Sequence, residues 1–138
     1  MKAVPRGIRN NNPLNIRKGN NWKGERHPQT DKSFEEFQSM ELGLRAGFVL
    51  IRNYMSGRTT GGVKCNTIEK IIRRWAPPTE NATQKYIDFV AKHCSTPSQL
   101  QISFANKPLM CSLVRAMAYV ECGQWIDSDI ISSAYDLV

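Results

Sequence analysis

The strongest constraint on the fold is a helical pattern in residues 108–125, PLMCSLVRAMAYVECGQW. Apolar residues recur there at spacings of three and four, which places them on one face of a helix. Pro108 suits the first turn of a helix, and Gly123 suits the position just after its last turn. The sequence therefore predicts a helix over residues 109–122.

Four other segments show the helical period, and capping residues, glycine or proline mark most of their ends. We expect helices from residue 41 until Gly57 after a Ser39 cap, from Asn66 until Pro77-Pro78, from a Thr83 cap to about residue 94, and over about 129–137.

Between Trp22 and Phe37 the helical period disappears. Glycine, proline and the polar run 29–32 are typical of turns around short extended pieces, which Phe34 would help to anchor. We expect a small irregular hairpin there. The predicted fold class is therefore mainly α, with one small β-hairpin insert in a single domain of residues 1–138.

The net charge of +7 and the pI near 9.5 favour a polyanionic partner, which means nucleic acid, an acidic membrane surface or an anionic cell-wall polymer. No apolar run approaches the roughly 20 residues that a membrane span needs. Residues 1–5 are not followed by the apolar core of a signal peptide. We expect synthesis in the cytoplasm and export, if any, by another route.

The residues that most often bind metals are scattered. None of the cysteines forms a CxxC pair, and no histidine has a partner at ligand spacing, so we expect no metal site. The sequence leaves open whether the cysteines form disulfides, although a cytoplasmic protein normally keeps its thiols reduced. These residues are Cys65, Cys94, Cys111, Cys122, His27 and His93.

A glutamate ends the strongest helix. Met110, Val114, Met117 and Glu121 are spaced by four, three and four, so the carboxylate shares an otherwise apolar face. Desolvation there raises the pKa of a glutamate, and the group costs free energy unless it is paired, neutralised or used. An acid catalyst of glycoside cleavage has such a position. The alternative is a glutamate that rotates into water or pairs with an arginine.

Several stretches resemble known proteins. AMAYVECG, residues 116–123, resembles the helix end that carries the catalytic glutamate in lysozyme-like peptidoglycan-cleaving enzymes. NNNPLNIR, residues 10–17, with the Trp22-x-Gly24 element and the hairpin, resembles the segment after that glutamate in glucosaminidases and lytic transglycosylases. Here the order is reversed, as in a circular permutation, which surface termini make tolerable. RGIRNNNPLNIR and RWAPPTENATQKYIDFV also resemble virion-associated phage and prophage proteins.

The resemblance implies that the asparagines of the opening loop line a glycan cleft beside Glu121, with Trp22 against a sugar face. Side-chain amides offer donors and acceptors without charge, which suits hydroxyl and N-acetyl groups. The alternative is that they make turn and cap bonds to their own backbone, and we expect a mixture of both roles. These asparagines are Asn10, Asn11, Asn12 and Asn15.

The remaining catalytic candidates also follow from the resemblance. Tyr86 would reach the catalytic glutamate, as a tyrosine does in lytic transglycosylases, or would be a core residue. A lysozyme needs a second carboxylate, for which we favour Asp31 and then Glu25. If none faces Glu121, the resemblance implies a transglycosylase that forms a 1,6-anhydro sugar. Hydrolysis and transglycosylation stay open at this point.

The expected function is that of a phage-type peptidoglycan-cleaving glycosidase, a muramidase or lytic transglycosylase that needs neither cofactor nor metal. Its expected partners are bacterial cell-wall peptidoglycan and other phage virion proteins, and its place of action is the cell wall or periplasm. One alternative is an inactive virion structural protein with the same fold. Another is a basic nucleic-acid-binding protein, which we favour less because the basic residues are scattered and form no binding motif.

Overall fold

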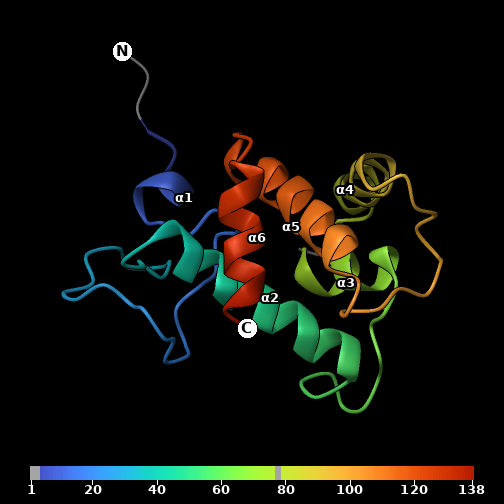
Figure 1. Ribbon diagram of the computed structural model, residues 1–138, viewed down its shortest axis with the longest axis horizontal. Coiled ribbons are helices and arrows are strands. Elements are labelled where there is room, and N and C mark those ends of the chain that lie inside the picture. Colours follow the sequence, from blue (N-terminus) through green and yellow to red (C-terminus); the bar gives the residue numbers. More distant parts are fainter. Residues whose placement is uncertain (1–3, 77–78) are drawn as a thin grey trace.

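The computed structural model describes residues 4–76 and 79–138, apart from the side chains of Glu80 and Asn81. The described chain is mainly α-helical, which confirms the predicted fold class (Figure 1). None of its helices is both long and apolar enough to cross a bilayer. The helices are α1 (Arg6–Arg9), α2 (Met40–Ser56), α3 (Ile68–Trp75), α4 (Glu80–His93), α5 (Lys107–Cys122) and α6 (Ser128–Asp136).

Helix α5 lies at the centre and packs against α1, α2, α4 and α6 (Figure 1). It begins where the Asn106 side chain accepts a hydrogen bond from the Leu109 amide, at 3.3 Å. It ends at Gly123, whose positive φ of 76° suits glycine and whose amide donates to the Tyr119 carbonyl. The predicted helix is therefore confirmed, with a start two residues earlier than expected.

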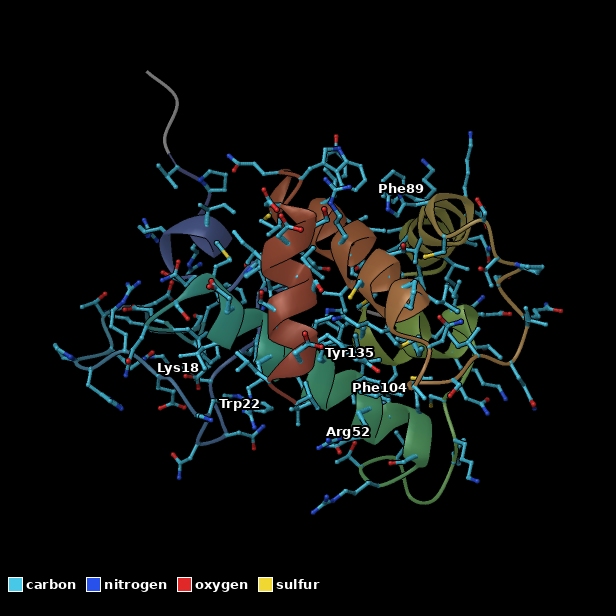
Figure 2. All side chains as sticks on the ribbon, viewed as in Figure 1. Lys18, Trp22, Arg52, Phe89, Phe104 and Tyr135 are labelled. Atoms are coloured by element: carbon cyan, nitrogen blue, oxygen red, sulfur yellow. The ribbon has the colours of Figure 1, made fainter. Side chains whose placement is uncertain are left out.

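Helix α2 also begins and ends as predicted, with the Ser39 hydroxyl accepting from the Leu42 amide and with Gly57 in the left-handed conformation. Helix α6 packs along it. Phe48 of α2 meets Tyr135 of α6 edge to face at 5.5 Å, and Phe104 stacks on the same tyrosine at 5.3 Å (Figure 2). These aromatic contacts close the core between the two helices.

Two predicted caps were wrong. Helix α3 is capped by the Thr67 hydroxyl, which accepts from the Lys70 amide, rather than by Asn66. Helix α4 begins earlier than expected, so Thr83 lies inside its first turn and its amide donates to the Thr79 carbonyl. Thr67 is the sequence neighbour of the predicted cap of α3. In α4 the cap position falls at Thr79, which makes no side-chain cap hydrogen bond. Pro77 and Pro78, expected to end the preceding helix, lie outside the described residues.

The expected hairpin is reduced to two isolated antiparallel bridges, Arg17 with Phe34 and Glu25 with Phe37. Side-chain carboxylates accept hydrogen bonds from several backbone amides that would otherwise pair with a neighbouring strand. Asp31 accepts from the amides of Ser33 and Phe34, for example. Such local side-chain bonds compete with sheet formation, so the segment stays irregular.

The opening loop, residues 10–16, packs tightly against two glycines on one face of α2. A Cβ atom at Gly43 would lie 1.8 Å from the carbonyl oxygen of Asn11, and one at Gly47 would lie 2.1 Å from a methyl carbon of Leu14. Leu14 itself is fully buried in the core. The two glycines therefore let the loop backbone approach the helix, and this contact positions the loop for the site.

This contact leads to a prediction for Gly43→Ala. The variant should unfold more easily by about 1–3 kcal/mol, because the added methyl group overlaps backbone that has little freedom to move. Gly47→Ala is the matched comparison. Gly47→Ala should lose less free energy of unfolding, because the overlapping atom there is the end of a flexible side chain and alanine favours the helix. Chemical denaturation of both variants tests the order, which would be contradicted by an equal or larger loss in Gly47→Ala.

Candidate active site

Three of the four predicted loop asparagines bind other parts of the fold. The Asn10 amide donates to the Asp31 carboxylate at 3.0 Å, and the Asn11 amide donates to the Phe37 carbonyl at 3.1 Å. The Asn12 amide donates to the carbonyls of residues 16 and 35, and its oxygen accepts from the amide of residue 16. These side chains brace the loop against the segment that follows it, and none of the three lines a pocket with Glu121.

Asn15 is different, because it connects the loop to the end of α5. Its side-chain amide donates to the backbone carbonyl of Glu121 at 3.1 Å, across 106 positions of sequence. It also takes a positive φ of 54°, which asparagine tolerates better than most residues. The opening loop and the glutamate therefore lie together, as the resemblance implies.

The Glu121 carboxyl group is partly buried and has a raised pKa. Burial is the main cause, because it penalises the charged form. The Tyr86 hydroxyl and the Asn15 amide hydrogen-bond to the carboxyl group and lower its pKa, but by less. A glutamate in this environment holds a proton at higher pH than an exposed one, as a general acid requires.

Two pockets meet at Glu121. The first, called here the apolar pocket, has a volume of about 480 Å³ and lies between α4 and the end of α5. Its described lining residues are Ala76, Thr79, Ala82, Thr83, Lys85, Tyr86, Phe89, Val120 and Glu121.

The second, called here the polar pocket, has a volume of about 510 Å³ and lies between the opening loop, α2 and the end of α3. Its described lining residues are Asn15, Ile16, Arg17, Asn20, Phe34, Leu50, Tyr54, Trp75, Ala76 and Glu121. Glu121 and Ala76 line both pockets, so the carboxyl group faces a cleft that extends to either side of it. The volumes suit a ligand of several small rings.

Helix α4 supplies Tyr86 from a buried position. Its hydroxyl lies 3.5 Å from the Met117 carbonyl and hydrogen-bonds to Glu121. Burial and then the neighbouring carboxylate raise the pKa of Tyr86, so the hydroxyl keeps its proton and acts as a donor. Tyr86 is thus both a core residue and a neighbour of the acid.

Asp31 is not brought to the cleft. Arg6 donates to both of its oxygens, at 2.6 and 2.5 Å, and Asn10 adds a third bond. The Arg6 guanidinium, followed by the other hydrogen bonds, holds the pKa of Asp31 far below its usual range. This carboxylate organises the turn after residue 30, and its contacts do not support our first choice of second carboxylate.

Glu25 and Trp22 are not among the described residues that line either pocket. Glu25 accepts a hydrogen bond from the Trp22 backbone amide at 2.8 Å and hydrogen-bonds to the buried Glu35, whose pKa is raised by burial and by this neighbour. The Trp22 ring packs against the core on the loop side, far from Phe89 of the apolar pocket (Figure 2). Neither Glu25 nor Trp22 lines a pocket with Glu121.

The sequence analysis missed several residues of the polar pocket. Trp75 meets Tyr54 edge to face at 6.2 Å, and the Arg17 guanidinium lies 4.8 Å from the centre of the Phe34 ring. Trp75 directly follows two arginines in the sequence. Its place in the last turn of the predicted helix, just before the expected helix end, was the available signal.

Glu121 is the one carboxylate among the described residues that line these two pockets. The side chain of Glu80, next in sequence to Thr79, is not among the described groups. In the described part of the chain no group of three or more His, Cys, Asp or Glu residues is arranged to hold a metal ion. The four cysteines are free thiols.

Comparison with known proteins relates this chain to a phage protein. Protein P5 of Pseudoalteromonas phage PM2 is 40% identical over 129 residues, which cover 89% of this chain and 74% of Protein P5. The chain belongs to the family of Protein P5. No protein-family model matches the sequence. The expected relationship to phage proteins is therefore confirmed in its general form, while the lysozyme-like assignment is finer than this relationship and stays a prediction.

The bonding of Asp31 leads to a prediction for this member of the Protein P5 family. Its pKa is lower in the folded than in the unfolded chain, so its contribution to stability is present above the ordinary aspartate pKa and is lost as the pH falls below it. Asp31→Asn should lower the Tm by several degrees at pH 7, and the difference from the unaltered protein should shrink below about pH 4. Thermal unfolding across this pH range tests it. A difference that is constant with pH would contradict the assigned role of the charge.

Proposed function

We propose that the protein cleaves the glycan strands of bacterial peptidoglycan as a lytic transglycosylase, with Glu121 as the catalytic acid and then the base. The observation that carries the proposal is the carboxyl group itself. It has a pKa raised by burial, hydrogen bonds from Tyr86 and Asn15, and a pocket on either side. Cleavage of a glycosidic bond needs such a group between the two sugars that it separates.

In the first step the protonated Glu121 carboxyl donates its proton to the bridging oxygen of the glycosidic bond. The bond between this oxygen and C1 of the adjacent sugar breaks, and the electron pair leaves with the oxygen, which becomes a hydroxyl group. Positive charge develops at C1 as in an oxocarbenium ion. The resulting Glu121 carboxylate lies beside this charge, while Tyr86 and Asn15 stabilise it by hydrogen bonds.

In the second step the same carboxylate acts as a base. It accepts the proton of the 6-hydroxyl group of the cleaved sugar, whose oxygen forms a bond to C1 and closes a 1,6-anhydro ring. The proton returns to Glu121, so the enzyme is regenerated and no water is consumed. A single carboxyl group is sufficient for this sequence of steps.

The two residues that we considered as a second catalytic carboxylate are bonded to other parts of the fold, and this favours the single-carboxylate mechanism over hydrolysis. Asp31 is bonded to Arg6 and Asn10, and Glu25 is bonded to Trp22 and Glu35. The contact between Tyr86 and Glu121 supports the same choice, since the resemblance relates this tyrosine to the transglycosylases.

The two pockets would hold sugars on the two sides of the cleaved bond. Trp75 and Tyr54 offer ring faces and edges in the polar pocket, and Phe89 does so in the apolar one. The net charge of +7 would help to hold the protein on an anionic wall. Because its family includes a phage protein, we propose that this activity acts at the host cell wall.

Glu121→Gln gives the first test. The variant should lose at least about a hundredfold in the rate of wall solubilisation, because a general acid contributes that much or more. Mass spectrometry of the fragments released by the unaltered protein should find 1,6-anhydro ends. Since ionising the buried carboxyl group costs free energy, the variant should unfold at an equal or higher temperature at pH 7.

Glu41→Gln is the matched control, because it removes the same group from the first turn of α2, outside both pockets. It should retain activity. An inactive native protein on several wall types would contradict the proposal and favour an inactive virion protein. Reducing ends in place of anhydro ends would mean hydrolysis and would contradict the single-carboxylate mechanism.

The pH dependence of activity gives a second test. Activity needs protonated Glu121, so the rate should fall as the pH rises through its raised pKa. Tyr86 lowers that pKa, so Tyr86→Phe should move the fall in rate to higher pH and slow the reaction at its optimum. Tyr54→Phe, which removes a hydroxyl from the polar pocket, is the control and should not shift the profile. A shift to lower pH in Tyr86→Phe would contradict the assigned hydrogen bond.

A further inference from the structure

Arg17 is held in place by contacts that leave its charge available. Its backbone pairs with Phe34 in an antiparallel bridge, and its guanidinium lies 4.8 Å from the centre of the Phe34 ring. Arg6 lies over the same ring at 4.5 Å, so the ring lies near two cations. Stacking of a guanidinium on an aromatic ring restricts its position without using its N–H donors.

The two arginines differ in what else they bind. Arg6 donates to both oxygens of Asp31, so its positive charge is balanced by this carboxylate. For Arg17, no side-chain hydrogen bond or ion pair with a described residue is present. Arg17 is also the one cationic residue among the described lining of the polar pocket, which it shares with Glu121. A fixed guanidinium with unused donors beside a proposed catalytic acid suits recognition of an anionic group on the substrate.

We propose that Arg17 binds a carboxylate of the peptide stems that branch from the glycan strand, and that the enzyme thereby favours strands that carry them. This inference rests on the proposed function. The sugar rings and N-acetyl groups of the strand are neutral, whereas the free carboxylates of the peptide stems are anionic. The planar fork of arginine matches a carboxylate with two parallel hydrogen bonds. The polar pocket would therefore hold the sugar whose peptide stem extends toward the opening loop.

Phosphate groups of polymers attached to some walls are a second source of negative charge. The test therefore uses peptidoglycan purified free of such polymers, in two forms. One is untreated, and in the other the carboxyl groups have been converted to methylamides with a carbodiimide and methylamine. The reagent is removed before the protein is added. Conversion removes the charge of the carboxylates and leaves the glycan bonds unchanged.

The measured quantity is the ratio of initial cleavage rates on the untreated and the amidated wall. For the unaltered protein we expect a ratio of roughly three to five, the size of an exposed ion pair with good geometry. Arg17→Gln should bring the ratio close to one. Arg17→Lys should give an intermediate ratio, because lysine keeps the charge without the fork.

Arg52→Gln is the matched control. It makes the same chemical change on α2 outside both pockets, away from Lys18, the sequence neighbour of Arg17 (Figure 2). Glutamine is as good a helix former as arginine, so the helix should not be weakened. Arg52→Gln should keep the ratio of the unaltered protein. An equal loss in this control would show general attraction to the wall and would overturn the assignment of Arg17.

Two other results would also overturn it. One is an unchanged ratio in Arg17→Gln, and the other is a ratio of one for the unaltered protein. Sedimentation of Glu121→Gln protein with each wall, with and without Arg17→Gln, measures recognition apart from cleavage. A native protein that cuts neither wall would refute the proposed function, and equal sedimentation with both walls would then refute the role of Arg17 separately.

Discussion

The close approach of the opening loop to helix α2 is the contact on which the candidate site depends. Gly43 leaves room for the Asn11 carbonyl, and Gly47 leaves room for Leu14, which anchors the loop in the core. Only with the loop in this position does Asn15 reach the end of α5. A packing constraint between backbone and helix therefore determines which polar groups stand beside the glutamate.

Burial gives the glutamate its chemical character, and the burial comes from elements distant in sequence. Helix α4 covers one side of Glu121 with Tyr86 and Phe89, while the opening loop covers another. Desolvation makes the charged form of this carboxylate less stable, and the carboxylate lies where two pockets meet. Such costs concentrate where a protein needs a group with an altered pKa, which is why this position supports a catalytic role.

The loop region shows how much polar chemistry serves the fold alone. The amides of Asn10 and Asn12 and the carboxylate of Asp31 make hydrogen bonds to other residues of the fold. These bonds replace a strand ladder and keep the segment irregular, yet they hold Arg17 and Phe34 at the pocket wall. Most of the polar residues that resemble a binding motif in the sequence therefore stabilise the loop, and only a few residues of this region line the cleft.

The sequence by itself determined the helices and the apolar setting of Glu121, because helical spacing, caps and glycine stops act within a few residues of the chain. It did not determine which polar residues share the cleft. An asparagine or a carboxylate has many partners of similar energy, and the choice depends on how distant segments pack. The pairing of Asp31 with Arg6, the contact of Asn15 with α5 and the position of Trp75 were therefore decided only by the tertiary structure.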